Sequence, residues 1–116
     1  MPHLIIEYSA NVRQLTSPAE LNRIGHKVMI ESGLFSVPDI KSRAYATDDY
    51  LVGEKGSDGS FVHVTVYLLE GRSTQQKQDL SEALRAALKV PLEKIDQLSI
   101  DIRELAKDTY RKYVGG

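Results

Sequence analysis

Four residues of the sequence have types and positions suited to chemistry on an organic acid: Pro2, Lys41, Arg43 and Arg72. Pro2 directly follows Met1, and methionine aminopeptidases accept a small second residue such as proline. Removal of Met1 would turn the ring nitrogen of Pro2 into a free secondary amine, which is a group that accepts a proton. A second interpretation also fits, in which the Met-Pro pair only leads into a strand.

A base at Pro2 needs surroundings that favour the neutral amine. An α-amino group normally titrates near pH ~8, and both burial and nearby cations disfavour its charged form. A unit cation at about 5 Å costs an ammonium group roughly 3 kcal/mol at an effective dielectric constant of about 20. One or two well-placed Arg or Lys side chains therefore suffice, and the same cations would bind an anionic substrate.

Arg72, Lys41 and Arg43 are the candidate cations. Arg72 precedes Ser73, the expected N-cap of a helix, where a guanidinium and the free amides of the first turn can face one anion. An ordinary solvated arginine at a turn is the alternative. Lys41 and Arg43 have the same parity on an expected strand and therefore point to one face of the sheet. That face lies either near the amine of Pro2 or against water.

The sequence predicts two similar halves, at about residues 1–53 and 60–116, within a single domain of residues 1–116. Strands are expected at 4–8, at 40–45 continuing towards 51–52, at 61–69 and at 98–105. Helices are expected to begin after the N-caps Ser17 and Ser73, with Glu20 and Gln76 closing capping boxes. Each half therefore reads strand, helix, strand, with enough residues between its strands for a helical crossover.

Two such units predict an α+β fold: a four-stranded mixed sheet with both helices on one face. We expect the two strands that flank the loop at 53–60 to form an antiparallel pair. The first strand has three consecutive aliphatic residues, so we expect it to be buried on both faces. Since no helix remains to cover apolar residues on the second face, we infer a homo-oligomer that buries this open face.

Composition narrows the class of protein. The 116 residues include 41% hydrophobic and 27% charged residues, as in globular domains. The net charge of −1 shows no overall excess of basic residues of the kind that binds nucleic acid or membranes. The chain has no cysteine, and the spacing of His3, His26 and His63 does not suit a metal site. Because the sequence has no signal-peptide pattern and no long apolar run, we expect the protein to be located in the cytoplasm.

Short motifs at residues 1–9, 40–43, 61–65, 71–73, 98–99 and 104–105 occur in an order that covers nearly the whole chain. The first of these reads Met-Pro-His-Leu-Ile-Ile-Glu-Tyr-Ser, and the fourth reads Gly-Arg-Ser. In these motifs the chain resembles the 5-carboxymethyl-2-hydroxymuconate isomerases of the tautomerase superfamily. The resemblance implies a β-α-β pseudo-repeat fold, a homotrimer, no cofactor and catalysis by an N-terminal proline.

The resemblance also implies roles for the candidate residues. Pro2 is the general base that takes the 2-hydroxyl proton of a muconate-type dienol acid from aromatic-acid breakdown and returns a proton to carbon. Arg72 binds a substrate carboxylate, and Arg43 matches the family pattern. Lys41 occupies a position where the family usually has Arg. A lysine keeps the positive charge but lacks the two parallel N–H groups with which a guanidinium binds a carboxylate.

Two alternatives to this isomerase interpretation stay open. The same amine could serve another reaction, such as decarboxylation, hydration or dehalogenation. The chain could instead be a non-catalytic oligomeric binding module.

Overall fold

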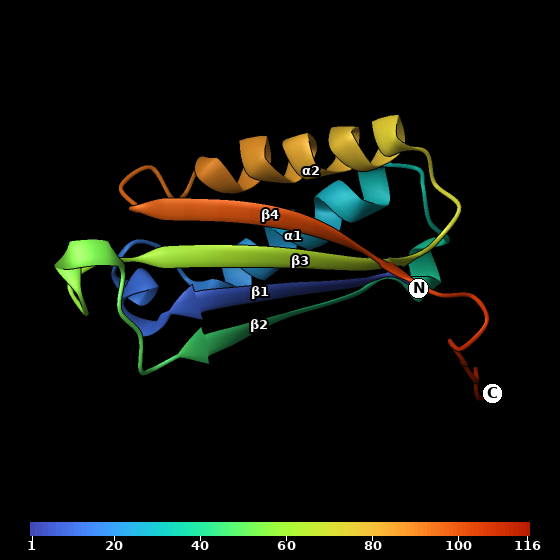
Figure 1. The fold of residues 1–116 in the computed structure, drawn as a ribbon, viewed down its shortest axis with the longest axis horizontal. Coiled ribbons are helices and arrows are strands. Elements are labelled where there is room, and N and C mark those ends of the chain that lie inside the picture. The colour runs from blue at the N-terminus through green and yellow to red at the C-terminus, as the bar shows by residue number, and fades with distance from the viewer.

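The computed structural model describes residues 1–116 as one four-stranded sheet with two helices packed on one side (Figure 1). The strands are β1 (His3–Ser9), β2 (Lys41–Thr47), β3 (Phe61–Leu69) and β4 (Gln97–Leu105), and the helices are α1 (Pro18–Glu31) and α2 (Thr74–Lys89). The strand order is β2-β1-β3-β4, in which β1 is parallel to β2, β3 is parallel to β4 and β1 is antiparallel to β3. The predicted α+β fold, with a mixed sheet from two β-α-β units, is confirmed.

Both helices begin at the predicted N-caps. The Ser17 hydroxyl accepts a hydrogen bond from the Glu20 amide, and the Ser73 hydroxyl accepts one from the Gln76 amide, each at 3.1 Å. The Gln76 side chain also accepts from the Ser73 amide at 2.9 Å and so completes the capping box of α2. In α1 the Glu20 carboxylate binds Arg23 instead, so the predicted capping box is only half formed there. The complete capping box fixes where α2 begins, and so it also fixes the position of Arg72, which precedes the N-cap Ser73.

The core is one layer of side chains between the helices and the sheet. It contains Leu4 and Ile6 of β1, Val62, Val64, Val66 and Leu68 of β3, Leu21 and Met29 of α1, and Leu80, Leu84 and Leu88 of α2. All of these side chains are almost completely buried, so β1 cannot move along its axis without opening the core. Neither α1 nor α2 has the length and hydrophobicity that a membrane-spanning helix requires.

The second face of the sheet is polar, which corrects the expectation of apolar residues on both faces. In β1, Leu4 and Ile6 are buried against the helices, whereas Ile5 is half-buried and Glu7 is exposed. The register places Ile5 beside Arg43 of β2, and neighbouring rows of the open face are mostly polar. Because side chains alternate along a strand, three consecutive aliphatic residues put only one of them on the open face. In the protomer, residues 3–7 of β1 are therefore fully buried on one face only.

The expectation that β2 and β3 form an antiparallel pair is wrong, because β1 lies between them. Residues 48–60 pass from β2 across the end of β1 to β3, and they include the 3-10 helix Gly53–Lys55 and a bridge between Val52 and Gly56. Strands β1 and β3 are the most apolar in the chain and occupy the centre of the sheet. The polar strand β2 and the alternating strand β4 form its edges, where charged side chains remain in water.

One end of the sheet collects several element ends. Strands β1 and β2 begin there, β3 and β4 end there, and the N-terminus of the chain lies at the same end as the tail that follows β4 (Figure 1). The topology therefore brings the residues around positions 2, 41, 70 and 106 together.

Candidate active site

A pocket of about 340 Å³ lies at this end of the sheet. It is lined by Met1, Phe35, Ser36, Asp39, Leu69, Arg72, Tyr110 and Lys112. These residues come from the segment before β1, the connection between α1 and β2, the end of β3, the turn between β3 and α2, and the C-terminal tail. A larger hollow of about 440 Å³ between α1 and α2 is lined by Glu31 and Asp79 and by no Lys or Arg, so it suits an anionic ligand poorly.

The amine end of β1 is buried in this region. Met1 is 8% exposed and Pro2 is buried, and the Pro2 carbonyl accepts a hydrogen bond from the Lys41 amide at 3.2 Å. Burial lowers the pKa of the terminal amine, and the charges of Lys41 and Lys112 lower this pKa further, whereas the Asp39 carboxylate raises it. The surroundings of this strand end therefore favour a neutral amine.

Lys41 and Arg43 lie on the open face of the sheet, as their shared parity predicted. In the register Lys41 is beside His3, and Arg43 is beside Ile5. The Lys41 ammonium donates to the Asp39 carbonyl, and Nη1 of Arg43 lies 3.1 Å from Nδ1 of His3. Neither residue lines the pocket. Lys41 acts on the terminal amine through its charge, whereas Arg43 lies two register positions further along the strands and contacts His3 instead.

Arg72 lines the pocket, but part of its guanidinium is already engaged. Nη2 donates to the Leu34 carbonyl at 2.8 Å and Nη1 donates to the Leu69 carbonyl at 3.3 Å. The guanidinium carbon lies 5.0 Å from the centre of the Phe35 ring. The capping box occupies the Ser73 and Gln76 amides, which leaves fewer free amides near Arg72 for the expected anion site. The remaining N–H groups of Arg72 are the ones that a carboxylate could use.

The sequence did not single out six residues of this pocket, namely Phe35, Ser36, Asp39, Leu69, Tyr110 and Lys112. The Lys112 ammonium forms an ion pair with the Asp39 carboxylate at 2.5 Å, although the two residues are far apart in the sequence. Residues 111–116 have no regular secondary structure and therefore no periodicity that predicts a position. The basic and aromatic composition of the tail was the one signal for its role.

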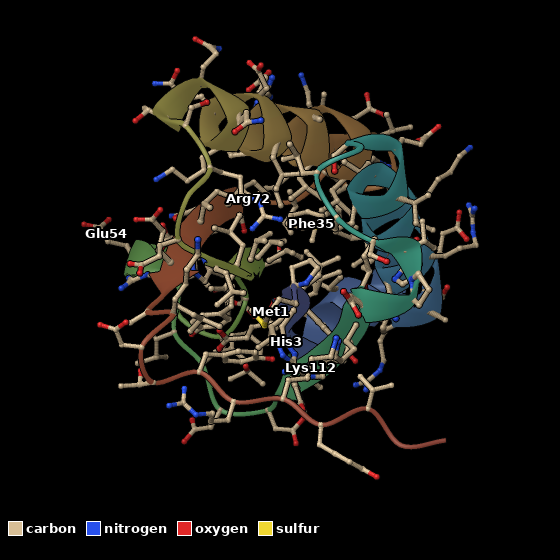
Figure 2. The ribbon with its side chains drawn as sticks, turned by 90° about the vertical axis from the view of Figure 1, so that its right-hand side faces the viewer. Met1, His3, Phe35, Glu54, Arg72 and Lys112 are labelled. Atoms are coloured by element: carbon tan, nitrogen blue, oxygen red, sulfur yellow. The ribbon has the colours of Figure 1, made fainter.

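The pocket combines a buried chain end, cationic side chains and an aromatic wall. In Figure 2, Arg72 and Lys112 lie on opposite sides of Met1, and both line the same pocket. No group of three or more His, Asp or Glu side chains is arranged to hold a metal ion. The three histidines have separate neighbours: Arg43 for His3, Ser42 for His26 and Ser99 for His63. The arrangement suits the binding of an anion next to an amine that is held neutral.

Comparison with known proteins gives consistent matches over nearly the whole chain. The sequence profile of the family described as 5-carboxymethyl-2-hydroxymuconate isomerase matches residues 2–113. A 5-carboxymethyl-2-hydroxymuconate Delta-isomerase of Escherichia coli is 28% identical over 110 residues, which cover 90% of this chain and 87% of that protein.

Solved structures match as well. The crystal structure of a 5-carboxymethyl-2-hydroxymuconate isomerase from Deinococcus radiodurans R1 is 26% identical, with a TM-score of 0.87 over 98% of this chain and 90% of that chain. A fused 4-OT described as a wild-type symmetric trimer is 19% identical, with a TM-score of 0.76 over 97% of this chain and 93% of that chain, and shares the fold.

Proposed function

The chain belongs to the 5-carboxymethyl-2-hydroxymuconate isomerase family, and we propose that it moves one proton within an unsaturated 2-hydroxy acid that has two or three carboxylates. The proposed substrate is 5-carboxymethyl-2-hydroxymuconate, the compound that gives the family its name. The observation that carries the proposal is the buried amine end of β1 next to Lys41 and Lys112, in a pocket that Arg72 also lines.

In the proposed reaction the base is the ring nitrogen of Pro2 after removal of Met1. This nitrogen takes the proton of the 2-hydroxyl group, and the electron pair of the O–H bond forms the C2=O bond. The electron pair of C2=C3 moves to C3=C4, and the pair of C4=C5 forms a new C5–H bond with the proton that Pro2 returns. One proton moves from oxygen to carbon, so atoms and electrons balance without an oxidant or reductant.

The surroundings of Pro2 support its role as the base. Burial, Lys41 and Lys112 lower the pKa of the Met1 amine, and the amine of Pro2 would replace that group one residue further along β1. Met1 itself lines the pocket and is 8% exposed, so its removal would free volume next to the new amine. Arg72 would then bind a substrate carboxylate through its unengaged N–H groups. Lys41, which does not line the pocket, would act through its charge on the amine.

We further propose that the protein is a homotrimer which covers the open face of the sheet. A fused 4-OT that shares this fold is a symmetric trimer. The open face includes Arg43, His63, Asp101 and Arg103, so its contacts would be hydrogen bonds and ion pairs as well as apolar packing. Light scattering on a size-exclusion column would test the stoichiometry. The cytoplasmic location stays a prediction from the sequence.

The experiment that tests the base compares the chain with a free Pro2 amine against the same chain with Met1 retained. Intact-mass spectrometry identifies each form, and ultraviolet absorbance follows loss of the dienol. General base catalysis contributes roughly 10²–10⁴-fold, so the Met1-retaining form should lose at least about 100-fold in kcat. Pro2→Ala, which also presents a free amine, separates the ring nitrogen from the chain terminus. Equal activity of the processed and Met1-retaining forms would contradict the proposal.

The same preparations distinguish the alternative reactions. A panel of unsaturated and halogenated acids, followed by proton NMR in D₂O, separates isomerisation from decarboxylation, hydration and dehalogenation. Isomerisation places deuterium on carbon without loss of carbon dioxide or halide. If the processed chain released carbon dioxide or halide and left the dienol unchanged, the amine would serve another reaction.

A further inference from the structure

Lys112 reaches the pocket from the other end of the chain. The tail after β4 leaves the sheet at the end where the N-terminus lies (Figure 1). The Lys112 ammonium pairs with Asp39 at 2.5 Å, and both residues line the pocket with Met1 and Arg72. Lys112 also lowers the pKa of the Met1 amine. The tail therefore brings a second cation to the chain end that holds the proposed base.

The ion pair between Lys112 and Asp39 contributes little to the stability of the fold. The Lys112 and Asp39 side chains are 30% and 36% exposed, and ion pairs of this kind contribute little to the stability of a fold. An ammonium has three N–H donors, so Lys112 can bind a substrate carboxylate while it keeps its contact with Asp39. Asp39 is also the only acidic side chain that lines the pocket, so it does not neutralise both Lys112 and Arg72.

The two cations that line the pocket lie on opposite sides of Met1 in the view of Figure 2. In Figure 2 Met1 is between Arg72 and Lys112, and the pocket that contains all three has a volume of about 340 Å³. An acid with a carboxylate at each end of a conjugated chain matches this arrangement, because it can contact both cations at once with its double bonds in the pocket between them. An acid with one carboxylate would leave one of the cations without a substrate partner.

We propose that Lys112 is a specificity-determining residue that binds a second substrate carboxylate opposite Arg72 and so selects acids with a carboxylate at both ends. This inference rests on the proposed function for the reaction, but its binding part does not require Pro2 to be the base. A charge-assisted hydrogen bond to a carboxylate gives roughly 10- to 100-fold in affinity or kcat/KM. The preference for two carboxylates over one should therefore depend on Lys112 by this factor.

The test compares kcat/KM for 2-hydroxymuconate, which has a carboxylate at each end, with kcat/KM for phenylenolpyruvate, which has one. Lys112→Met keeps the apolar stem and removes the charge, and it should lower the ratio of the two values by roughly 10- to 100-fold. Lys112→Arg should restore most of the ratio. Any change in the amine pKa affects both substrates alike and cancels in the ratio.

A matched control is available at the far end of the sheet. Lys55 forms an ion pair with Asp96, also at 2.5 Å, in the loop region between β2 and β3 and the turn before β4. Lys55→Met removes the same charge and the same kind of ion pair away from the pocket. It should leave the ratio unchanged. An unchanged ratio in Lys112→Met, or an equal loss in Lys55→Met, would overturn the inference.

A binding experiment separates this inference from the proposed reaction. Calorimetric titration with trans,trans-muconate and with sorbate measures the affinity for two carboxylates and for one, without any enol proton to transfer. If no variant isomerises any acid but Lys112→Met still weakens muconate binding alone by 10-fold or more, the role of Lys112 holds and the proposed reaction is wrong. If muconate binds Lys112→Met as tightly as it binds the unchanged chain, the role of Lys112 is refuted.

Discussion

Replacement of Arg72 by Met would separate two roles of this residue, the binding of a substrate and the support of the pocket wall. The guanidinium donates to the carbonyls of Leu34 and Leu69, and it stacks on Phe35. It therefore ties the segment after α1 to the end of β3. Met keeps a long apolar stem but has no N–H group and no charge, so it removes these contacts with little change in volume.

The expected cost follows from the individual contacts. Hydrogen bonds from a charged donor contribute about 1.5–3 kcal/mol when well formed. Arg72 is half-buried and its contact with Leu69 is 3.3 Å long, so we assign the two bonds about 1.5 kcal/mol together. The contact with the Phe35 ring adds roughly 0.5–1 kcal/mol. We expect Arg72→Met to lower the free energy of unfolding by about 2 kcal/mol, and a solvated arginine would change it by less than about 0.5 kcal/mol.

Urea unfolding measures this cost, with all variants at the same protomer concentration because an oligomer gains stability with concentration. Phe35→Leu, alone and with Arg72→Met, completes a double-mutant cycle that should give a coupling energy of roughly 0.5–1 kcal/mol. Arg72→Lys should recover only part of the stability, because an ammonium cannot reach both carbonyls with a planar fork. A stability of Arg72→Met within about 0.5 kcal/mol of the unchanged chain would refute the reasoning.

Three further substitutions test the local physics. Gly25→Ala should destabilise the fold by about 1–2 kcal/mol in urea, because a Cβ there would lie 2.7 Å from Cδ2 of buried Leu4 and this overpacking outweighs the gain in helix propensity; higher stability would contradict this. Asp39→Asn should move the acidic limb of kcat/KM to lower pH, because the Asp39 carboxylate raises the pKa of the terminal amine and its loss lowers that pKa; a shift to higher pH would contradict this. Ser73→Ala should cost about 1 kcal/mol of unfolding free energy through the lost N-cap, and Ser73→Asn should cost less.

Local signals in the sequence predicted most of the elements. The alternation from Phe61 to Leu69 gave the bounds of β3, and the Ser73 and Gln76 pair gave the start of α2. These signals depend on residues within a few positions of one another, and such interactions form in any fold that contains the segment. The same is true of the shared parity of Lys41 and Arg43, which does put both on the open face.

Contacts between distant segments could not be predicted in this way. The neighbour of β3 depends on which strands are apolar enough for the centre of the sheet, and the loop between β2 and β3 suggested a hairpin that does not form. The contact of Lys112 with Asp39 depends on where β4 ends and how the tail turns. The hydrogen bonds from Arg72 to two carbonyls could not be predicted either, because Leu34, which provides one of them, is remote from Arg72 in the sequence.

The strand directions explain why the pocket forms where it does. Since β1 and β2 are parallel, the residues before each of them lie at one end of the sheet, and since β3 is antiparallel to β1, the residues after β3 and β4 lie at the same end. Positions 2, 41 and 72 therefore lie at one end of the sheet because the core fixes the strands, whereas Lys112 reaches this end from the irregular tail and pairs there with Asp39. Substitutions at positions 41, 72 and 112 change the charge around the amine without replacing a side chain of the buried core. The identity of the bound acid can thus change while the fold remains the same, which is why tests on Lys112 and Arg72 are informative about the substrate.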